Sequence, residues 1–338
     1  MNITIADVAK VANVSKATVS AVLNNKSTVA PHTRKKVLEV IKRLNYRPSE
    51  VARSLSSRKT KCIGLVIKEI DNPYFAKVMK GVFDTCCENG FTVLLGSSEL
   101  SPDQEMQSIE TLSSQRVDGF IISPLQDQEM DFTYLADLLR EKYPMVTLGS
   151  IKNYTTNVVD IDNVNAAYQA VKYLIELGHI EIAYFAGPSY SSHSNDRLAG
   201  YQQAFIDHNL PIPKNFIQQV GSYIGNSYQA GKEFFSQNSN LPTAVFCYND
   251  LVAIGLINAL LELGIPVPDQ VSVIGFDDID ICESVKISLT TVHVPAYDIG
   301  RKAAELLIQH IMNPDEIMNE KIILEAKLIE RNSCAKKS

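Results

Sequence analysis

Residues able to hold a small molecule recur directly after short apolar runs of this chain. Asn249 ends one such run and Asp277 ends another, while Arg197 opens a helical stretch that reads DRLAGY. Tyr74 and Phe75 follow the first run, at the start of another helical stretch. Aromatic rings can cover the apolar face of a ligand, and arginine, asparagine and aspartate can hold its hydroxyl groups. The combination predicts a site for a hydroxylated small molecule.

The elements that must position these residues alternate from residue 61 onward. Short apolar runs, expected to be strands, lie at 63–67, 91–95, 119–122, 145–148, 182–185, 244–247 and 271–275. Helical stretches lie at 74–89, 103–115, 164–177, 196–208, 226–237, 250–263 and 295–311, and 321–329 looks like a strand again. Such alternation predicts parallel sheets with helices on both faces and ligands beyond the carboxyl ends of the strands. A pattern this long favours two lobes.

Patterns typical of catalysis or metal binding are missing from the sequence. No Gly-x-Gly-x-x-Gly follows the first strand, and the segment GPSYS lacks the second glycine of a nucleophile elbow. The six cysteines form no Cys-x-x-Cys pair, and the histidines show no metal spacing. We therefore expect no enzyme activity, no metal and no cofactor. A solute-binding receptor remains an alternative, because the sheet pattern alone permits it.

The first 45 residues have a different pattern, that of three short helices. Residues 5–12 place apolar side chains on one face, and Ser15 is a suitable N-cap for a second helix over 16–24. A third helix begins near Pro31, where the missing N–H costs nothing. Two helices joined by so tight a turn indicate a helix-turn-helix, whose second helix enters the major groove of DNA.

Charge separates this head from the rest of the chain. Residues 1–60 carry seven lysines, five arginines and three acidic residues, a net charge of +9. The whole chain carries −6, so the remainder carries −15. A basic head on an acidic body indicates that only the head meets a polyanion.

A short tether follows the three helices. Pro48 ends the third helix, and Ser49 could cap a helix of about two turns, too short to persist alone in water. We interpret this segment as a hinge helix that becomes ordered on a partner. Leu55 suits a wedge in the minor groove, or alternatively docks on the body.

The motifs TIADVAKVANVSKATVS, VLNN, TRKKVLEVIKRLNYRP and SEVARSLSSRKT are similar to those of the lactose-repressor (LacI/GalR) family, and the likeness continues to the C-terminus. The resemblance implies an all-α helix-turn-helix head plus an α/β, two-lobed, periplasmic-binding-protein-like (type I) effector domain. It implies a DNA-binding domain at 1–47, a hinge helix and linker at 48–60, and an effector-binding and dimerisation domain at 61–338. The first lobe would hold about 61–160 and 292–322, and the second about 161–290 and 323–331, with crossings near 160–162, 290–292 and 322–325.

The resemblance also assigns functional residues. Base-reading positions are occupied by Lys16, Ala17 and Ala21, and phosphate-contacting positions by Thr18, Ser20, Asn24 and Thr33. Hinge-helix positions at the DNA are occupied by Val51, Ala52 and Leu55, with Val51 also a dimer contact. Effector-contacting positions are occupied by Tyr74, Phe75, Ser123, His193, Arg197, Tyr223, Asn249 and Asp277.

Two positions depart from the pattern of the family. Ala21 stands where many members carry arginine or histidine. Alanine cannot hydrogen-bond to guanine as arginine does, so we expect it to contact a thymine methyl at that base of the operator. Gly149 stands where sugar- and purine-binding members often have aspartate, which removes one anchor for a hydroxyl group. The second departure keeps open a variant in which a phosphocarrier protein acts as corepressor on the first lobe.

These features together predict a transcriptional regulator, most simply a repressor, controlled by a small effector such as a sugar or sugar derivative. Its expected partners are pseudo-palindromic operator DNA and a second copy of the chain, because two heads bind far more tightly than one. No apolar run is long enough to span a membrane and the N-terminus is no secretion signal, so a cytoplasmic protein is expected.

Overall fold

The computed structural model describes residues 3–23, 26–46, 59–125, 133–237, 241–314 and 319–337. The chain divides into two compact units, Met1–Thr60 and Lys61–Ser338, here called the head and the body. None of the helices in the described ranges is long and apolar enough to cross a membrane.

The head contains three helices around a small apolar core. The helices are α1 (Ile5–Ala12), α2 (Lys16–Leu23) and α3 (Pro31–Arg43). The core side chains are Val8, Ala9, Ala12, Val19, Val22, Val37 and Val40. The helix-turn-helix predicted from the sequence is confirmed.

Local capping explains where the first two helices begin. Thr4 caps α1 in a capping box with Asp7, whose carboxylate accepts from the Thr4 backbone N–H at 2.8 Å. Ser15 caps α2, because its Oγ accepts from the Thr18 backbone N–H at 3.0 Å. Asn13 takes a left-handed conformation between the helices, with φ of 50°, and so makes the turn tight.

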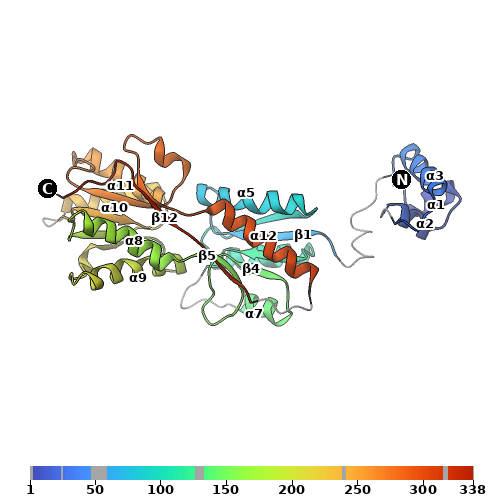
Figure 1. The fold of residues 1–338 in the computed structure, drawn as a ribbon, viewed down its shortest axis with the longest axis horizontal. Helices are drawn as coiled ribbons and strands as arrows, with labels where there is room; N and C mark the ends of the chain where they lie inside the picture. Colours follow the sequence, from blue (N-terminus) through green and yellow to red (C-terminus); the bar gives the residue numbers. More distant parts are fainter. Residues whose placement is uncertain are drawn as a thin grey trace. The chain divides into compact units, whose positions relative to one another are not determined.

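The body contains two six-stranded sheets, each with helices on both faces (Figure 1). The first sheet has the order β11-β5-β4-β3-β1-β2, and the second β12-β10-β9-β8-β6-β7. All neighbouring strands are parallel except β10 and β12. We call the halves built on these sheets the first lobe and the second lobe.

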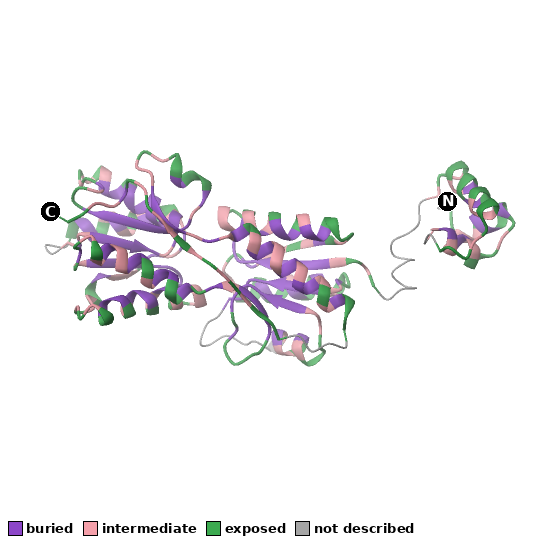
Figure 2. Ribbon diagram, in the orientation of Figure 1, coloured by how far each residue is buried: buried purple, intermediate pink, exposed green. Residues whose placement is uncertain are grey.

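The strands of the first sheet are β1 (Cys62–Ile67), β2 (Thr92–Ser97), β3 (Gly119–Ile122), β4 (Met145–Thr147), β5 (Asn157–Ile161) and β11 (Lys321–Leu324). Those of the second are β6 (Ile182–Ala186), β7 (Ile217–Gln219), β8 (Ala244–Cys247), β9 (Ser272–Asp277), β10 (Thr290–His293) and β12 (Lys327–Ile329). The central strands of both sheets are buried, which explains their continuous apolar sequences (Figure 2).

The body helices are α5 (Pro73–Glu88), α6 (Pro102–Ser114), α7 (Thr133–Arg140), α8 (Asn163–Glu176), α9 (Ser192–Asp207), α10 (Ile224–Gln237), α11 (Asp250–Glu262) and α12 (Ala296–Met312). Two short 3₁₀ helices, η1 (Lys214–Phe216) and η2 (Asp280–Glu283), lie in loops. Helix α12 lies beside α5 on the first lobe (Figure 1). Their close approach needs glycine, since a Cβ at Gly300 would come within 2.0 Å of the Val78 carbonyl oxygen.

The chain passes between the lobes three times. It leaves the first sheet after Ile161, returns after His293, and crosses again between Leu324 and Lys327. The second crossing comes later than the expected 290–292, because β10 pairs with β9 as far as His293. The expected single strand over 321–329 is two strands, one in each sheet.

Candidate functional site: a pocket between the lobes and a groove on the head

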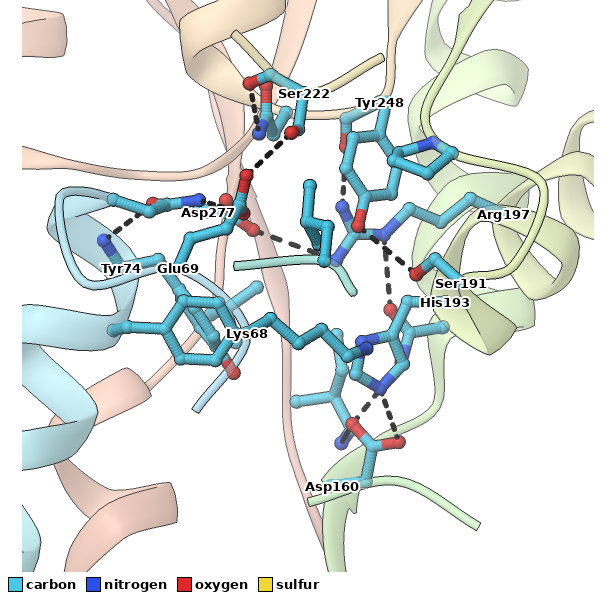
Figure 3. Close-up of a pocket in the computed structure, with 18 residues that line it drawn as sticks. Lys68, Glu69, Tyr74, Asp160, Ser191, His193, Arg197, Ser222, Tyr248 and Asp277 are labelled. Carbon is cyan, nitrogen blue, oxygen red and sulfur yellow. Dashed lines mark hydrogen bonds and ion pairs between the residues drawn. The ribbon is translucent and has the colours of Figure 1, made fainter. Parts of the chain in front are cut away.

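A pocket lies at the carboxyl ends of the strands, lined by residues of both lobes (Figure 3). Its lining includes six of the eight predicted effector contacts, namely Tyr74, Phe75, His193, Arg197, Asn249 and Asp277. The cavity is narrow, because the volume open to the centres of water molecules is only about 30 Å³. This is room for roughly two waters. In this conformation the pocket is closed.

The other two predicted effector contacts do not line the pocket. Ser123 is 1% exposed, and its Oγ has no hydrogen-bond partner among the described residues. Burial raises the pKa of the Tyr223 hydroxyl, and the charge and hydrogen bond of the neighbouring Glu69 raise it further. Following a strand does not fix which way a loop side chain points, and the roles of both residues as effector contacts stay predictions.

Arg197 is the most firmly held side chain of the second-lobe wall. Its Nε donates to Asn163 Oδ1 at 3.1 Å, and its Nη1 donates to the carbonyl oxygen of Tyr248. The guanidinium lies 3.6 Å from the centre of the Phe276 ring. These contacts fix its plane, so the donors that remain point in a set direction.

Asp277 ends β9 beside this guanidinium, with 3.6 Å between Asp277 Oδ1 and Arg197 Nη2. Its φ of 109° is a conformation that L residues rarely adopt. Burial raises the pKa of Asp277 well above its usual value, and Arg197 opposes this rise. A buried carboxyl group in a strained backbone is the kind of feature that collects at binding sites.

Asn249 and the Tyr74-Phe75 pair are positioned by helix starts. Asn249 caps α11 through an Oδ1 that accepts from the Val252 backbone N–H at 2.8 Å. Its amide group also donates to the Ser222 carbonyl oxygen at 3.2 Å, so half of its bonding capacity is used internally. Asn72 caps α5 in the same way, which places Tyr74 and Phe75 at the pocket.

The first-lobe wall carries three charged residues that the sequence analysis missed: Lys68, Glu69 and Asp160. Lys68 is 4% exposed, and its Nζ has no hydrogen-bond partner among the described residues. Burial lowers the pKa of Lys68 to about 8, and the carboxylates of Glu105, Asp160 and Glu69 oppose that effect. A charged group directly after a buried strand was the sequence signal that could have revealed Lys68 and Glu69.

Two carboxylates of the first lobe bond across the pocket to the second lobe. Glu69 Oε1 accepts from Ser222 Oγ at 2.6 Å, and Asp160 Oδ2 lies 3.3 Å from His193 Nε2. Outside the pocket, Lys77 of α5 pairs with Asp280 of η2 at 2.6 Å. These contacts hold the lobes together around the closed pocket.

Asp160 lies close to Gly149, the position where the family pattern led us to expect a carboxylate. A Cβ built at Gly149 would lie 3.7 Å from Asp160 Oδ2 and 2.9 Å from His193 Nε2. Asp160, on the neighbouring strand β5, thus places a carboxylate close to Gly149. Burial alone would raise the pKa of Asp160, but the charge and hydrogen bond of His193 bring that pKa below its usual value.

On the head, four predicted DNA contacts line one shallow groove. It is formed by α2, the start of α3 and the loop before it, and its lining includes Ala17, Thr18, Ala21 and Thr33. Lys16 is exposed at the start of α2, and Ser20 is half-buried. Asn24, Val51, Ala52 and Leu55 lie outside the described residues.

Family models match both units of the chain. Residues 4–49 match the model for bacterial regulatory proteins of the lacI family, and residues 171–334 match a periplasmic binding protein-like domain. A relative described as the HTH-type transcriptional repressor PurR of Haemophilus influenzae (strain PittEE) is 34% identical over 332 residues, 98% of each chain. The protein of the same name from Klebsiella pneumoniae (strain 342) is 37% identical, over 98% of this chain and 97% of that one.

This chain belongs to the lacI family of bacterial regulatory proteins. It is a DNA-binding transcriptional repressor with a helix-turn-helix head and a two-lobed body. Among solved structures, the lac repressor dimer bound to operator and the anti-inducer ONPF has a TM-score of 0.88 at 25% identity, covering 99% of this chain and 100% of that one. A transcriptional regulator CelR–cellobiose complex has a TM-score of 0.73 at 28% identity, covering 98% and 100%.

Proposed function

We propose that a small effector, a sugar or sugar derivative, binds between the two lobes and sets the affinity of the head for operator DNA. The observation that carries this proposal is the closed pocket. Room for about two waters cannot hold a sugar. Binding must therefore separate or rearrange the two walls, which couples occupancy of the pocket to the geometry of the lobes.

Known relatives support a small-molecule effector. The solved structures similar to this chain include one described with cellobiose and one with the anti-inducer ONPF. In our proposal Arg197 and Asp277 hold the polar groups of the effector, while Tyr74 and Phe75 cover its apolar face. A phosphocarrier protein as corepressor is the competing possibility, and the small molecules described with these two solved structures favour the effector instead.

At the operator, we propose that Lys16, Ala17 and Ala21 face base edges in the major groove. Thr18, Ser20 and Thr33 would contact phosphates on either side of the groove on the head. Ala17 and Ala21 offer only methyl groups, so Lys16 is the main polar reader of the three. Two copies of the chain, as in the lac repressor dimer, would place two heads on a pseudo-palindromic site.

The test begins by selecting operator sequences from random DNA with the full chain. Fluorescence anisotropy on the selected operator is then followed while sugars, sugar acids, phosphorylated sugars and nucleobases are added one at a time. We expect one compound to change the operator affinity at least 5-fold, within the usual range of coupling between two sites. The same compound should leave the affinity of Arg197→Ala unchanged.

Other outcomes separate the alternatives. A selected operator whose affinity responds to no compound, but responds to a phosphorylated carrier protein, would replace the effector proposal with the corepressor. Failure to select any sequence would contradict the assignment of Lys16, Ala17 and Ala21 as base readers.

A further inference from the structure

Lys68 and Arg197 enter the pocket from opposite walls (Figure 3). Lys68 follows β1 in the first lobe, and Arg197 lies on α9 in the second. Both are nearly inaccessible, with 4% and 6% of their surfaces exposed. Two buried cations facing one cavity are costly unless anions or hydrogen-bond acceptors compensate them.

The carboxylates around Lys68 compensate its charge without bonding to it. Glu105 accepts from the Leu125 backbone N–H at 2.9 Å and from the Tyr134 hydroxyl. Glu69 accepts from Ser222 and from Asn72 Nδ2, the latter at 3.1 Å.

Asp160 is committed in the same way. Its Oδ1 accepts from the Ile161 backbone N–H at 2.8 Å and from Asn163 Nδ2 at 3.2 Å, and its Oδ2 faces His193. The three N–H groups of Lys68 therefore have no hydrogen-bond acceptor among the described residues.

Free bonding capacity in the pocket consequently lies mostly with donors. Within the described residues, the three N–H groups of Lys68 have no partner, and two of the five N–H groups of Arg197 are used in hydrogen bonds. Asp277, beside Arg197, is the one carboxylate of the pocket lining for which no hydrogen bond is found among the described residues. A ligand that satisfies this pocket must be rich in acceptors and must offer a hydroxyl group or similar donor to Asp277.

The charge balance limits how negative that ligand can be. Lys68 and Arg197 share the lining with Glu69, Asp160 and Asp277, a formal charge of −1, and the raised pKa of Asp277 brings the lining closer to neutrality. One more negative charge placed between the two cations is favourable. A second, as on a phosphate monoester, would add repulsion from the nearby carboxylates.

We propose that the effector is a small hydroxylated carboxylic acid, whose single carboxylate lies between Lys68 and Arg197 while a hydroxyl group bonds to Asp277. This inference rests on the proposed function of the pocket and specifies its ligand. It adds Lys68 as the residue that selects for the acid.

The experiment uses the full chain and matched sets of compounds. Each set contains a neutral sugar, the acid obtained by oxidising it and the phosphate ester of the same sugar, for example glucose, gluconate, glucuronate and glucose 6-phosphate. Isothermal titration calorimetry measures binding, and anisotropy on the selected operator measures the response. We expect an acid to bind at least 10-fold more tightly than its matched neutral sugar and its phosphate.

Lys68→Met tests the role of the ammonium group. It should weaken binding of the acid roughly 10- to 100-fold, the effect of one charge-assisted hydrogen bond. Lys80→Met is the matched control, because Lys80 lies on α5 outside the pocket and pairs with Asp84. It should bind the acid like the wild type.

A wild-type measurement guards against misfolding of the variant. If the acid binds the protonated amine, its affinity should fall as the pH rises through about 8, where Lys68 loses its proton. The charged groups facing Lys68 are Glu69, Glu105, Asp160 and Arg197. Burial raises the pKa of Glu105, whereas His193 helps to hold the pKa of Asp160 below its usual value.

The outcomes distinguish this inference from the proposed function on which it rests. Tightest binding by a neutral sugar or a phosphate ester, with Lys68→Met unaffected, would overturn the carboxylate inference and leave effector control standing. Absence of any response to any compound would overturn both.

Discussion

The second-lobe wall of the pocket holds Arg197 by contacts from three directions, whereas the first-lobe wall presents Lys68 with no hydrogen-bond partner among the described residues. The carboxylates of the first-lobe wall are bonded to the second lobe instead, Glu69 to Ser222 and Asp160 to His193. One wall is therefore already organised, whereas in our proposal the other completes its bonding when the effector enters the pocket. A pocket of this kind can fix a ligand on one side and report its presence on the other.

Arg197→Ala tests the organised wall and should have the largest effect. It leaves Asp277 buried without its counter-charge and removes the partners of Asn163 and the Tyr248 carbonyl. Breaking a buried pair by removing one partner typically costs about 3–5 kcal/mol. Urea denaturation of the full chain, followed by circular dichroism, measures this loss. A body as stable as the wild type would mean that the wall is not held by Arg197.

Lys68→Met tests the incomplete wall and should act in the opposite direction. A pKa lowered from 10.5 to about 8 means that charging Lys68 in the folded body costs roughly 3 kcal/mol near neutral pH. Removing the amine should stabilise the body by up to this amount. Loss of the positive charge beside Glu105, whose pKa burial already raises, reduces the gain. Destabilisation comparable to that of Arg197→Ala would show that Lys68 is structural.

The pH dependence of stability follows from the same group. Between pH 8 and pH 10.5 the unfolded chain binds the Lys68 proton more strongly than the folded chain, so stability rises with pH in that window. Between pH 7.5 and 9.5 the wild type should gain about 2 kcal/mol relative to Lys68→Met. Denaturation of both proteins at these two pH values measures the difference, and parallel curves would contradict the shifted pKa.

The contrast between the walls also shows what could be predicted from sequence. Arg197, Asn249 and Asp277 follow strands or open helices in a recognisable pattern, and the structure brings them together at the pocket. The strands β1, β3, β8 and β9 were predicted to within two residues, because buried parallel strands have continuous apolar sequences. The head could also be predicted from local sequence, since its helices have their own capping residues and apolar faces.

The first-lobe wall was missed because its contacts are not local. Glu69 meets Ser222 across 153 positions of sequence, and Asp160 meets His193 across 33. No local pattern tells which charged residue after a strand will face a partner in the other lobe. Strand β5, which carries Asp160, was itself missed because its five residues include the polar Asn157 and Asp160.

Ser222→Ala should have an intermediate effect, on the closure of the pocket. It removes the bond from Ser222 Oγ to the Glu69 carboxylate, worth about 1.5–3 kcal/mol for a charged acceptor. If opening precedes binding, the association rate of the effector should rise roughly 10-fold or more. Stopped-flow tyrosine fluorescence measures the rate. Ser108→Ala is the control, because Ser108 bonds to Ser97 within the first lobe, and equal rates for both variants would argue that Glu69 does not hold the lobes.

Ser123→Ala should have the smallest effect and completes the comparison. Ser123 and Lys68 are the two described residues with a buried side-chain polar atom that has no hydrogen-bond partner, and they follow the adjacent strands β3 and β1. Only Lys68 lines the pocket. Removing an unpartnered hydroxyl should leave stability unchanged or raise it by up to about 1 kcal/mol, and binding of the effector should not change. Calorimetric titration measures the affinity, and a loss near that of Lys68→Met would place Ser123 at the ligand and extend the incomplete wall to β3.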